Sequence, residues 1–286
     1  MKFSLDWMAI GSGSLLALEV LVLTFLAKKA DDLRTTRFDD DALILERQNT
    51  AVALRRAGLF LGGTLAMAGV LSGPSKGLVA DFLGVALFGI VAYVLLFAGR
   101  ALCHALLLRG IDDDDACMNG NVSVGLVEGG LFLASGLLVQ GSVAGGSEDL
   151  LRGLATFALF FALGMLVLLL AVLLARRLGS PMGAAELARD NRAAAVETVG
   201  ALVANALLLR SALGGESQGL IADVLIFCAT GAMGIAVLLG FQLTLRRIFL
   251  PKANLGNALR DGNVAVVVVL QSLTIAFALI VGALLG

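Results

Sequence analysis

The chain has little charge, one histidine and three cysteines among its 286 residues. Charged residues make up 15% of it and the formal net charge is −1, which argues against nucleic acid as a partner. The cysteines form no CxxC pair, so we expect Cys103, Cys117 and Cys228 to be small hydrophobic side chains. His104 is the only histidine, and a single imidazole is a poor metal ligand set, so no metal site is predicted.

Motifs that carry catalysis are missing as well. No glycine-rich phosphate loop follows a strand, and no nucleophile–base pair is visible. The runs Asp39–Asp41 and Asp112–Asp115 lack the spaced ligands and glycine turn of an EF-hand, so we interpret them as solvated loop charges. The sequence therefore predicts neither an enzyme nor a cofactor. The alternative enzyme hypothesis, a lipid-modifying activity, would rest on Arg100, His104 and the second aspartate run.

Apolar residues are abundant instead. They make up 59% of the chain, and the mean hydropathy of +0.95 is too high for a water-soluble core. The excess lies in eight blocks of membrane-spanning length, near 6–27, 49–71, 79–108, 121–143, 150–175, 193–213, 221–245 and 263–285. Because backbone groups in lipid must bond internally, and these runs are too continuous for barrel strands, we predict an all-α polytopic membrane protein with about eight transmembrane helices.

A motif that opens four of these blocks divides the chain into repeats. Asn49, Asn121, Asn191 and Asn263 follow one another at nearly equal steps along the sequence. An aspartate precedes each asparagine at a similar distance; the four are Asp6, Asp81, Asp149 and Asp223. The pattern predicts four copies of one hairpin unit, an aspartate and a helix followed by a loop, the asparagine and a second helix.

A longer period joins the units in pairs. The interval from Asn49 to Asn191 is identical to the interval from Asn121 to Asn263 and spans half of the chain. We therefore predict two four-helix membrane repeats, 1–143 and 144–286. An even helix count inserts both halves the same way up, so they are parallel and we expect a pseudo-twofold axis along the membrane normal.

Basic residues give the orientation. The loops after the first, third, fifth and seventh helices hold fourteen lysines and arginines, whereas the opposite side holds four. By the positive-inside rule the asparagine-bearing loops face the cytoplasm and both termini lie on the non-cytoplasmic side.

The asparagines are typical helix N-caps, whose side-chain oxygen accepts an orphan backbone N–H. The functional alternative is that four partly positive helix N-termini converge on an anion or a headgroup. Small residues recur at fixed positions after each asparagine, as in Ala51, Gly58 and Gly62 after Asn49. These positions share one helix face, which predicts the seam where these helices pack closely; the alternative is the lining of a narrow pore.

Charged residues within the spans are the candidate functional groups. Arg55 and Glu197 stand at the same position after their asparagines and would neutralise each other near the axis, and Arg56 is a predicted partner of Glu128. The full set of intramembrane candidates is Arg55, Arg56, Glu128, Glu197 and Glu19. Polar residues expected at the inner interface are Arg100, His104 and Gln242.

The run Asn49–Leu54 with Gly58–Gly62, and the stretch from Asp81 to Arg100, resemble the family called domain of unknown function 350, whose YjfL-type members are four-helix bacterial inner-membrane proteins. The second half keeps Asn191 and Asn263 but loses the Asn-Thr-Ala sequence. The resemblance implies two such domains in tandem in a bacterial inner membrane. It also implies a link to envelope stress, through the gene neighbourhoods of relatives.

Two functions remain open beside the lipid-modifying one. The first is conduction or transport of an ion or small polar solute, based on the intramembrane charges and the small-residue seam. The second is a non-transporting scaffold whose basic loops dock a soluble protein, such as an envelope-stress partner, or anionic lipid. The lipid bilayer is the partner in either case. A homo-oligomer is possible, and the sequence identifies no substrate.

Overall fold

The computed structural model describes residues 7–35, 37–143, 150–179, 183–214, 218–248 and 255–285, and in these ranges the only regular elements are helices. Eight helices within these ranges are long and apolar enough to cross a membrane, which confirms the predicted all-α polytopic architecture. The long helices are α1 (Trp7–Arg34), α3 (Thr50–Leu71), α4 (Leu78–Leu107), α6 (Val122–Ser142), α7 (Leu150–Gly179), α9 (Arg192–Leu213), α10 (Leu220–Ile248) and α12 (Val264–Leu285).

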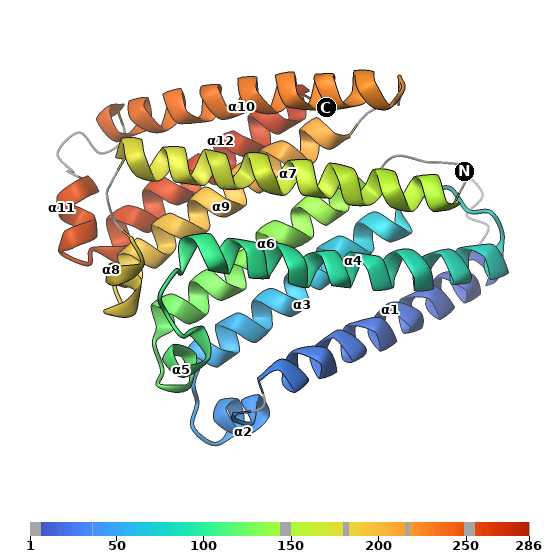
Figure 1. Cartoon of the computed structure of the whole chain (residues 1–286), viewed down its shortest axis with the longest axis horizontal. Helices are drawn as coiled ribbons and strands as arrows, with labels where there is room; N and C mark the ends of the chain where they lie inside the picture. The colour runs from blue at the N-terminus through green and yellow to red at the C-terminus, as the bar shows by residue number, and fades with distance from the viewer. Residues whose placement is uncertain are drawn as a thin grey trace.

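A short helix lies in the middle of each hairpin unit. These helices are α2 (Asp40–Leu45), α5 (Asp113–Met118), α8 (Ala184–Ala188) and α11 (Leu255–Arg260). Figure 1 shows all four at one end of the bundle, with the start of α1 and the end of α12 toward the other end. The asparagines that follow the short helices therefore lie at one edge, here called the asparagine edge.

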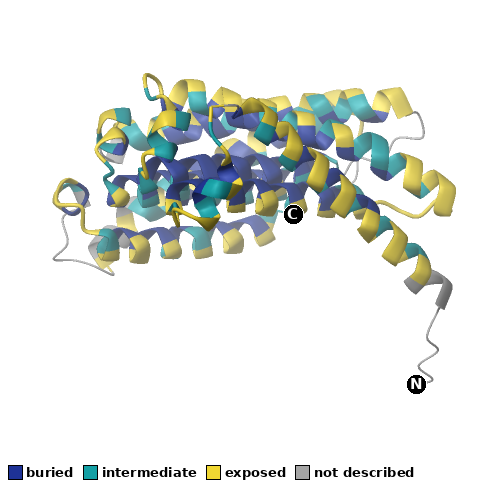
Figure 2. Ribbon diagram, turned by 90° about the horizontal axis from the view of Figure 1, so that it is seen from below, coloured by how far each residue is buried: buried dark blue, intermediate teal, exposed yellow. Residues whose placement is uncertain are grey.

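The long helices form two layers. The second long helices of the units, α3, α6, α9 and α12, pack one after the next in a row. Of the first long helices, α4 lies over α3 and α6, α7 over α6 and α9, and α10 over α9 and α12 (Figure 1). The row is the centre of the fold, since 83% of the apolar window of α6 is buried but only 17% of that of α1. Figure 2 shows α1 diverging from the other helices toward its N-terminal end.

Glycines set the spacing of the row, as the small-residue pattern predicts. A Cβ built on Gly58 of α3 would overlap the Cα of Gly129 of α6, and one on Gly62 would overlap the carbonyl of Phe132. Gly136 of α6 approaches the carbonyl of Gly62 in the same way. Backbones this close gain dispersion contacts that larger side chains would prevent, which is how helices associate without a hydrophobic drive.

Each asparagine accepts a hydrogen bond at the start of its row helix. The Oδ1 atoms of Asn49, Asn121 and Asn191 accept the N–H groups of Val52, Val124 and Ala194 at 3.2, 3.0 and 3.2 Å. Asn263 accepts from Val266 at 3.2 Å. Each bond satisfies a backbone N–H in the first turn of the helix, which has no carbonyl partner within the helix itself.

The other end of the asparagine side chain joins one unit to the next. Asn49 Nδ2 donates to the carbonyls of Cys117 and Met118, at 2.9 and 3.1 Å, where α5 ends. Asn121 Nδ2 donates to the carbonyl of Leu187 in α8 at 2.9 Å, and Asn191 Nδ2 to that of Leu259 in α11 at 2.8 Å. One amide thus caps its own helix and satisfies orphan carbonyls of the next unit's short helix.

The repeated aspartates have a local role. Asp81 accepts the N–H of Lys76 at 2.8 Å, and Asp223 accepts that of Gln218 at 2.8 Å, each from five residues earlier. Each carboxylate thereby orders the loop that enters the following long helix. Asp6 and Asp149 lie outside the described residues.

Gly129→Leu tests the glycine contact. A Cβ on Gly129 would lie 2.5 Å from the carbonyl oxygen of Leu54, so a leucine side chain would overpack the contact. We expect the free energy of unfolding to fall by about 3 kcal/mol. Gly84→Leu is the matched control, because nothing lies within 4 Å of its added Cβ. Equal stability of the two variants in denaturant titrations of detergent-solubilised protein would contradict the close packing.

Asn121→Asp separates the two roles of an asparagine. Aspartate keeps the capping oxygen but removes the donor to Leu187, so we expect a loss of about 1–3 kcal/mol in the free energy of unfolding. Asn263→Asp in monomeric protein is the control, because within the described residues Asn263 caps its helix but reaches no later short helix. A comparable loss in both variants would show that the amide contributes nothing between units.

Candidate functional site: a charge cluster in the first half

Buried and half-buried charged side chains gather near the asparagine edge of the first four-helix half. We call this group the charge cluster; its members are Asp31, Asp32, Asp40, Arg55, Arg56, Arg100, His104, Asp113, Asp114 and Glu128. They come from α1, α2, α3, α4, α5 and α6. The cluster therefore connects all six helices of the first half.

Arg55 is the most deeply buried cation of the cluster, with no exposed surface. Its Nη2 donates to both carboxylate oxygens of Asp40 in α2, at 2.9 and 3.0 Å, and its Nη1 donates to Asp114 in α5 at 2.9 Å. The guanidinium carbon also lies 5.7 Å from the centre of the Phe38 ring, a cation–π distance. One side chain of α3 thus holds two short helices.

Arg56 points toward α1 instead. Its Nη2 donates to Asp32 at 2.6 Å and also to Asp40, and its Nη1 donates to the carbonyl of Lys28 at 3.4 Å. The buried carboxylate of Asp31, also on α1, lies 3.9 Å from Nη1. The predicted pairing of Arg56 with Glu128 is therefore wrong, because Arg56 faces α1 and α2 while Glu128 faces α4.

Arg100 and His104 of α4 hold the fully buried carboxylate of Glu128 between them. Arg100 Nε donates to Glu128 Oε2 at 2.5 Å, and Arg100 Nη2 also donates to Asp113. His104 Nδ1 lies 2.9 Å from Glu128 Oε1, and its Nε2 lies 3.8 Å from Asp113 Oδ1. The imidazole is thus within reach of two carboxylates at once.

Three side chains of this arrangement are of the types that bind metals. His104, Asp113 and Glu128 each offer a ligand atom, and these atoms lie within 4.8 Å of one another. Arg100 already contacts both carboxylates, so a divalent cation would sit beside a guanidinium and repel it. The donor set suits an ion-paired network better than a metal.

Burial also decides the chemistry of the α5 segment. Burial raises the pKa of Asp114 above its ordinary value, although Arg34 and Arg55 oppose this. Asp112 is exposed, and the N–H of Asp115 that it accepts lowers its pKa. Burial raises the pKa of the Cys117 thiol to about 12, so this cysteine behaves as a small hydrophobic side chain.

The interpretation of the two aspartate runs as solvated loop charges is wrong for Asp40 and Asp113, while the exposed Asp41 and Asp115 agree with it. Asp40 and Asp113 are buried in the charge cluster, whereas Asp39 and Asp112 are the N-caps of α2 and α5. Three arginines within apolar spans, at 55, 56 and 100, are the signal that would have identified them. Such cations must find carboxylates, and the aspartate runs are the nearest supply at the same membrane edge.

Within its described residues the second half keeps the helices but not the charge cluster. The half-chain interval that takes Asn49 to Asn191 also takes Arg55 to Glu197, Arg56 to Thr198, Arg100 to Gln242 and Glu128 to Leu270. Gln271 Nε2 donates to Glu197. Gln242 is half-buried in α10, and its side chain makes no hydrogen bond to the described residues. The predicted contact between Arg55 and Glu197 is wrong, because α6 separates α3 from α9 in the row.

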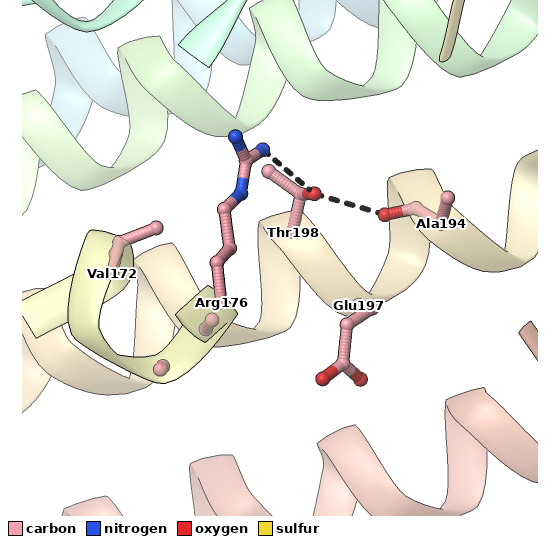
Figure 3. A pocket seen from close by; sticks show the side chains of 7 residues that line it. Val172, Arg176, Ala194, Glu197 and Thr198 are labelled. Atoms are coloured by element: carbon pink, nitrogen blue, oxygen red, sulfur yellow. Dashed lines mark hydrogen bonds between the residues drawn. The ribbon is translucent and has the colours of Figure 1, made fainter. Parts of the chain in front are cut away.

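A small cavity of about 30 Å³ lies beside Arg176, Glu197 and Thr198. Figure 3 shows Arg176 of α7 reaching to Thr198, whose hydroxyl is 3.3 Å from Nη2, while Glu197 points away from it toward α12. The volume suffices for about one water. The cavity lies where polar side chains of α7 and α9 meet in the second half.

Glu19 lies apart from the charge cluster, within the first apolar span. Its side chain is 8% exposed, and neither carboxylate oxygen has a hydrogen-bond partner in the described part of the chain. It shares one face of α1 with the buried residues Leu23, Ala27 and Asp31. Between Glu19 and the cluster, the hydroxyls of Thr24 and Tyr93 lie 2.7 Å apart.

Comparisons with known proteins agree with this architecture. A family model described as Domain of Unknown Function (DUF350) matches the chain twice, over residues 6–143 and 149–285. The chain is 25% identical over 244 residues to a UPF0719 transmembrane protein of Aquifex aeolicus (strain VF5), which covers 85% of this chain and 88% of that protein. No solved structure matches the chain. The two matches confirm the tandem duplication and the family resemblance.

Asp40→Ala tests the energetics of the cluster. It removes the carboxylate shared by two buried arginines, so we expect a loss of about 3 kcal/mol in the free energy of unfolding. Arg37→Ala is the control, because Arg37 pairs with Asp112 and Asp115 in an exposed position and should change stability little. Equal effects of the two changes in urea titrations would contradict a buried network.

Proposed function

Because the chain belongs to the DUF350 family, a domain of unknown function, we propose its function from its own geometry: its first half carries protons across a bacterial inner membrane. This narrows the hypothesis of ion or small-solute transport to the smallest ion. The second half, which has lost the charge cluster, then serves as a structural partner. No enzymatic step is part of the proposal.

The observation that carries the proposal is Glu19. An ionised carboxylate without partners in an apolar span is too costly to persist, so the group is held neutral or meets a transient partner. Both oxygens of Glu19 lack a protein donor among the described residues. A carboxyl group in this condition can take up and release a proton when water reaches it, which is the property that a proton pathway needs.

Polar groups follow Glu19 toward the asparagine edge. Thr24 is five residues further along α1, about 7.5 Å at the helical rise, and Asp31 is twelve residues further, about 18 Å. Thr24 bonds to Tyr93 of α4, and Asp31 belongs to the charge cluster, where it lies near Arg56. The first gap needs about two transient waters, and the second, about 10.5 Å from Thr24 to Asp31, needs about three. The proposed path therefore runs through side chains and a short chain of transient water.

Tight packing favours a proton over a larger solute. Backbone contact at Gly58, Gly62 and Gly136 leaves no passage between α3 and α6. The cavity beside Arg176 has room for about one water. A hydrated metal ion or an organic solute needs a wider opening, whereas a proton moves by exchange between neighbouring oxygens.

The alternative is a scaffold that transports nothing. It is favoured by Arg55, Arg56 and Arg100, which are all engaged by carboxylates and tie α2 and α5 to the bundle. Exposed basic residues at the asparagine edge, among them Lys29, Arg37 and Arg189, would then dock anionic lipid or an acidic face of an envelope-stress protein. Both readings place this edge in the cytoplasm, following the bias of basic residues.

The experiment is a proton-flux assay in liposomes. Purified protein is reconstituted with an internal pH dye, and a potassium gradient with valinomycin sets the membrane potential. We expect acidification above that of empty liposomes, and Glu19→Gln should slow it about a hundredfold, because an amide cannot exchange a proton. Glu46→Gln is the matched control, since Glu46 is exposed at the asparagine edge and should leave the flux unchanged.

Two results would decide against proton transport. One is a flux equal to that of empty liposomes in folded wild-type protein, and the other is a Glu19→Gln flux equal to wild type. The scaffold alternative is then tested by a photo-crosslinker at exposed Arg47 in cells; recovery of no specific protein or lipid would count against it.

A further inference from the structure

Each row helix has two packing faces, defined by positions counted from its asparagine. The front face comprises positions +2, +9, +13 and +20, and the back face comprises positions +4, +8 and +15. In α3 the front residues, Ala51, Gly58, Gly62 and Gly69, are all buried. They meet the back face of α6, made by Gly125, Gly129 and Gly136, which lies against the backbone of α3.

The same interface recurs along the row. At the front of α6, Gly130 meets Val199 and Gly141 meets the backbone of Arg210, both in α9. At the front of α9, Gly200 meets Gln271 of α12. Three successive helix pairs thus use one geometry, with all helices parallel and front packed on back.

Both ends of the row expose the faces that this geometry uses. The front residues of α12, namely Ala265, Ser272, Ala276 and Ala283, are all exposed. On the back face of α3, Ala57 and Thr64 are exposed and Ala53 is half-buried. One end therefore offers a front face of small residues, and the other offers a back face of small residues.

The asparagine contacts are open at the same two ends. Asn49, Asn121 and Asn191 each donate to carbonyls three or four residues before the next asparagine. Asn263 has no such acceptor among the described residues. The corresponding carbonyls of the first unit, on Leu45 and Glu46, receive no asparagine in the described part of the chain.

The covering layer is incomplete at the same place. The helices α4, α7 and α10 each lie over two neighbouring row helices, whereas α1 lies over α3 alone and beside α4. The place where a preceding row helix would lie under α1 is vacant within this chain, and α1 is the least buried long helix. A row helix that extended the series before α3 would supply that support.

We infer that a second copy of this chain, inserted the same way up, continues the row by packing the back face of its α3 on the front face of α12. Asn263 then donates to the carbonyls of Leu45 and Glu46 of the second copy, and α1 of that copy covers the new seam. The contact is heterologous, so it builds a closed ring or a longer row. The inference is independent of proton transport.

Cysteine crosslinking in membranes tests the contact. Position +9 of one helix meets position +8 of the next, as Gly58 meets Gly129, so Ser272 should face Ala57 of the second copy. In a Cys228→Ser background, which removes the exposed native thiol, Ala57→Cys and Ser272→Cys chains are co-expressed and oxidised. We expect mixed dimers at about ten times the yield of a collision control, because a contact raises effective concentration.

The control pairs Ala57→Cys with Met233→Cys, an exposed position on α10 outside the row. A chain that carries both Ala57→Cys and Ser272→Cys should give a ladder of higher oligomers or a closed ring. Asn263→Asp should lower the yield while leaving the stability of the monomer unchanged.

Three results would overturn the inference. They are a mixed-dimer yield equal to that of the control, a higher yield from Ala57→Cys alone than from the mixed pair, and an unchanged yield when Ala276→Trp is added to the Ser272→Cys chain. The substituted positions are exposed in the single chain, so the variants should fold. Circular dichroism checks this before crosslinking.

Discussion

The asparagine amide at the start of each row helix is the interaction on which the rest of the structure depends. A helix that begins at a membrane edge has donors that its own backbone cannot satisfy, and the short helix beside it has carbonyls in the same condition. Asn121 satisfies both, because its oxygen accepts from Val124 while its nitrogen donates to Leu187. Aspartate or serine would cap the helix equally well but would not make both bonds in this geometry.

This constraint explains why the repeat consists of a hairpin with a short helix. The amide has to reach the next unit, so adjacent row helices must start at the same depth and lie within close contact. Glycines at Gly58, Gly62 and Gly129 allow that distance. The hydrogen bonds at the asparagine edge and the glycine contacts within the span therefore require the same distance between row helices. A substitution that pushed the helices apart in the span would stretch the asparagine hydrogen bonds.

Much of the architecture was predictable because it depends on period and length. The steps between asparagines, the apolar runs and the small positions after each asparagine define the units, the spans and the packing face. The charge pairs were not predictable in the same way. The sequence spacing predicts from which side of α3 the Arg55 side chain extends, but it does not predict which helix packs on that side. The row places α6 there, and the short helices then bring Asp40 and Asp114 to it.

The charge cluster also shows how the two halves differ. The second half retains every long helix and its asparagines, yet Glu197, Thr198 and Leu270 stand where the first half has Arg55, Arg56 and Glu128. The fold thus does not require the cluster, since the asparagines and the small residues suffice for a half to pack. Because packing does not require them, the charges that only the first half carries can serve a function other than folding.

The direction of the asparagine contacts has a consequence for how the chain is made. Every such contact runs forward, from an asparagine to carbonyls 66 to 69 residues later. A ribosome delivers the N-terminal unit first, so each hairpin enters the membrane before the acceptor of its amide has been synthesised. The last bond of each unit then forms only when its successor is inserted, which ties the order of folding to the order of translation.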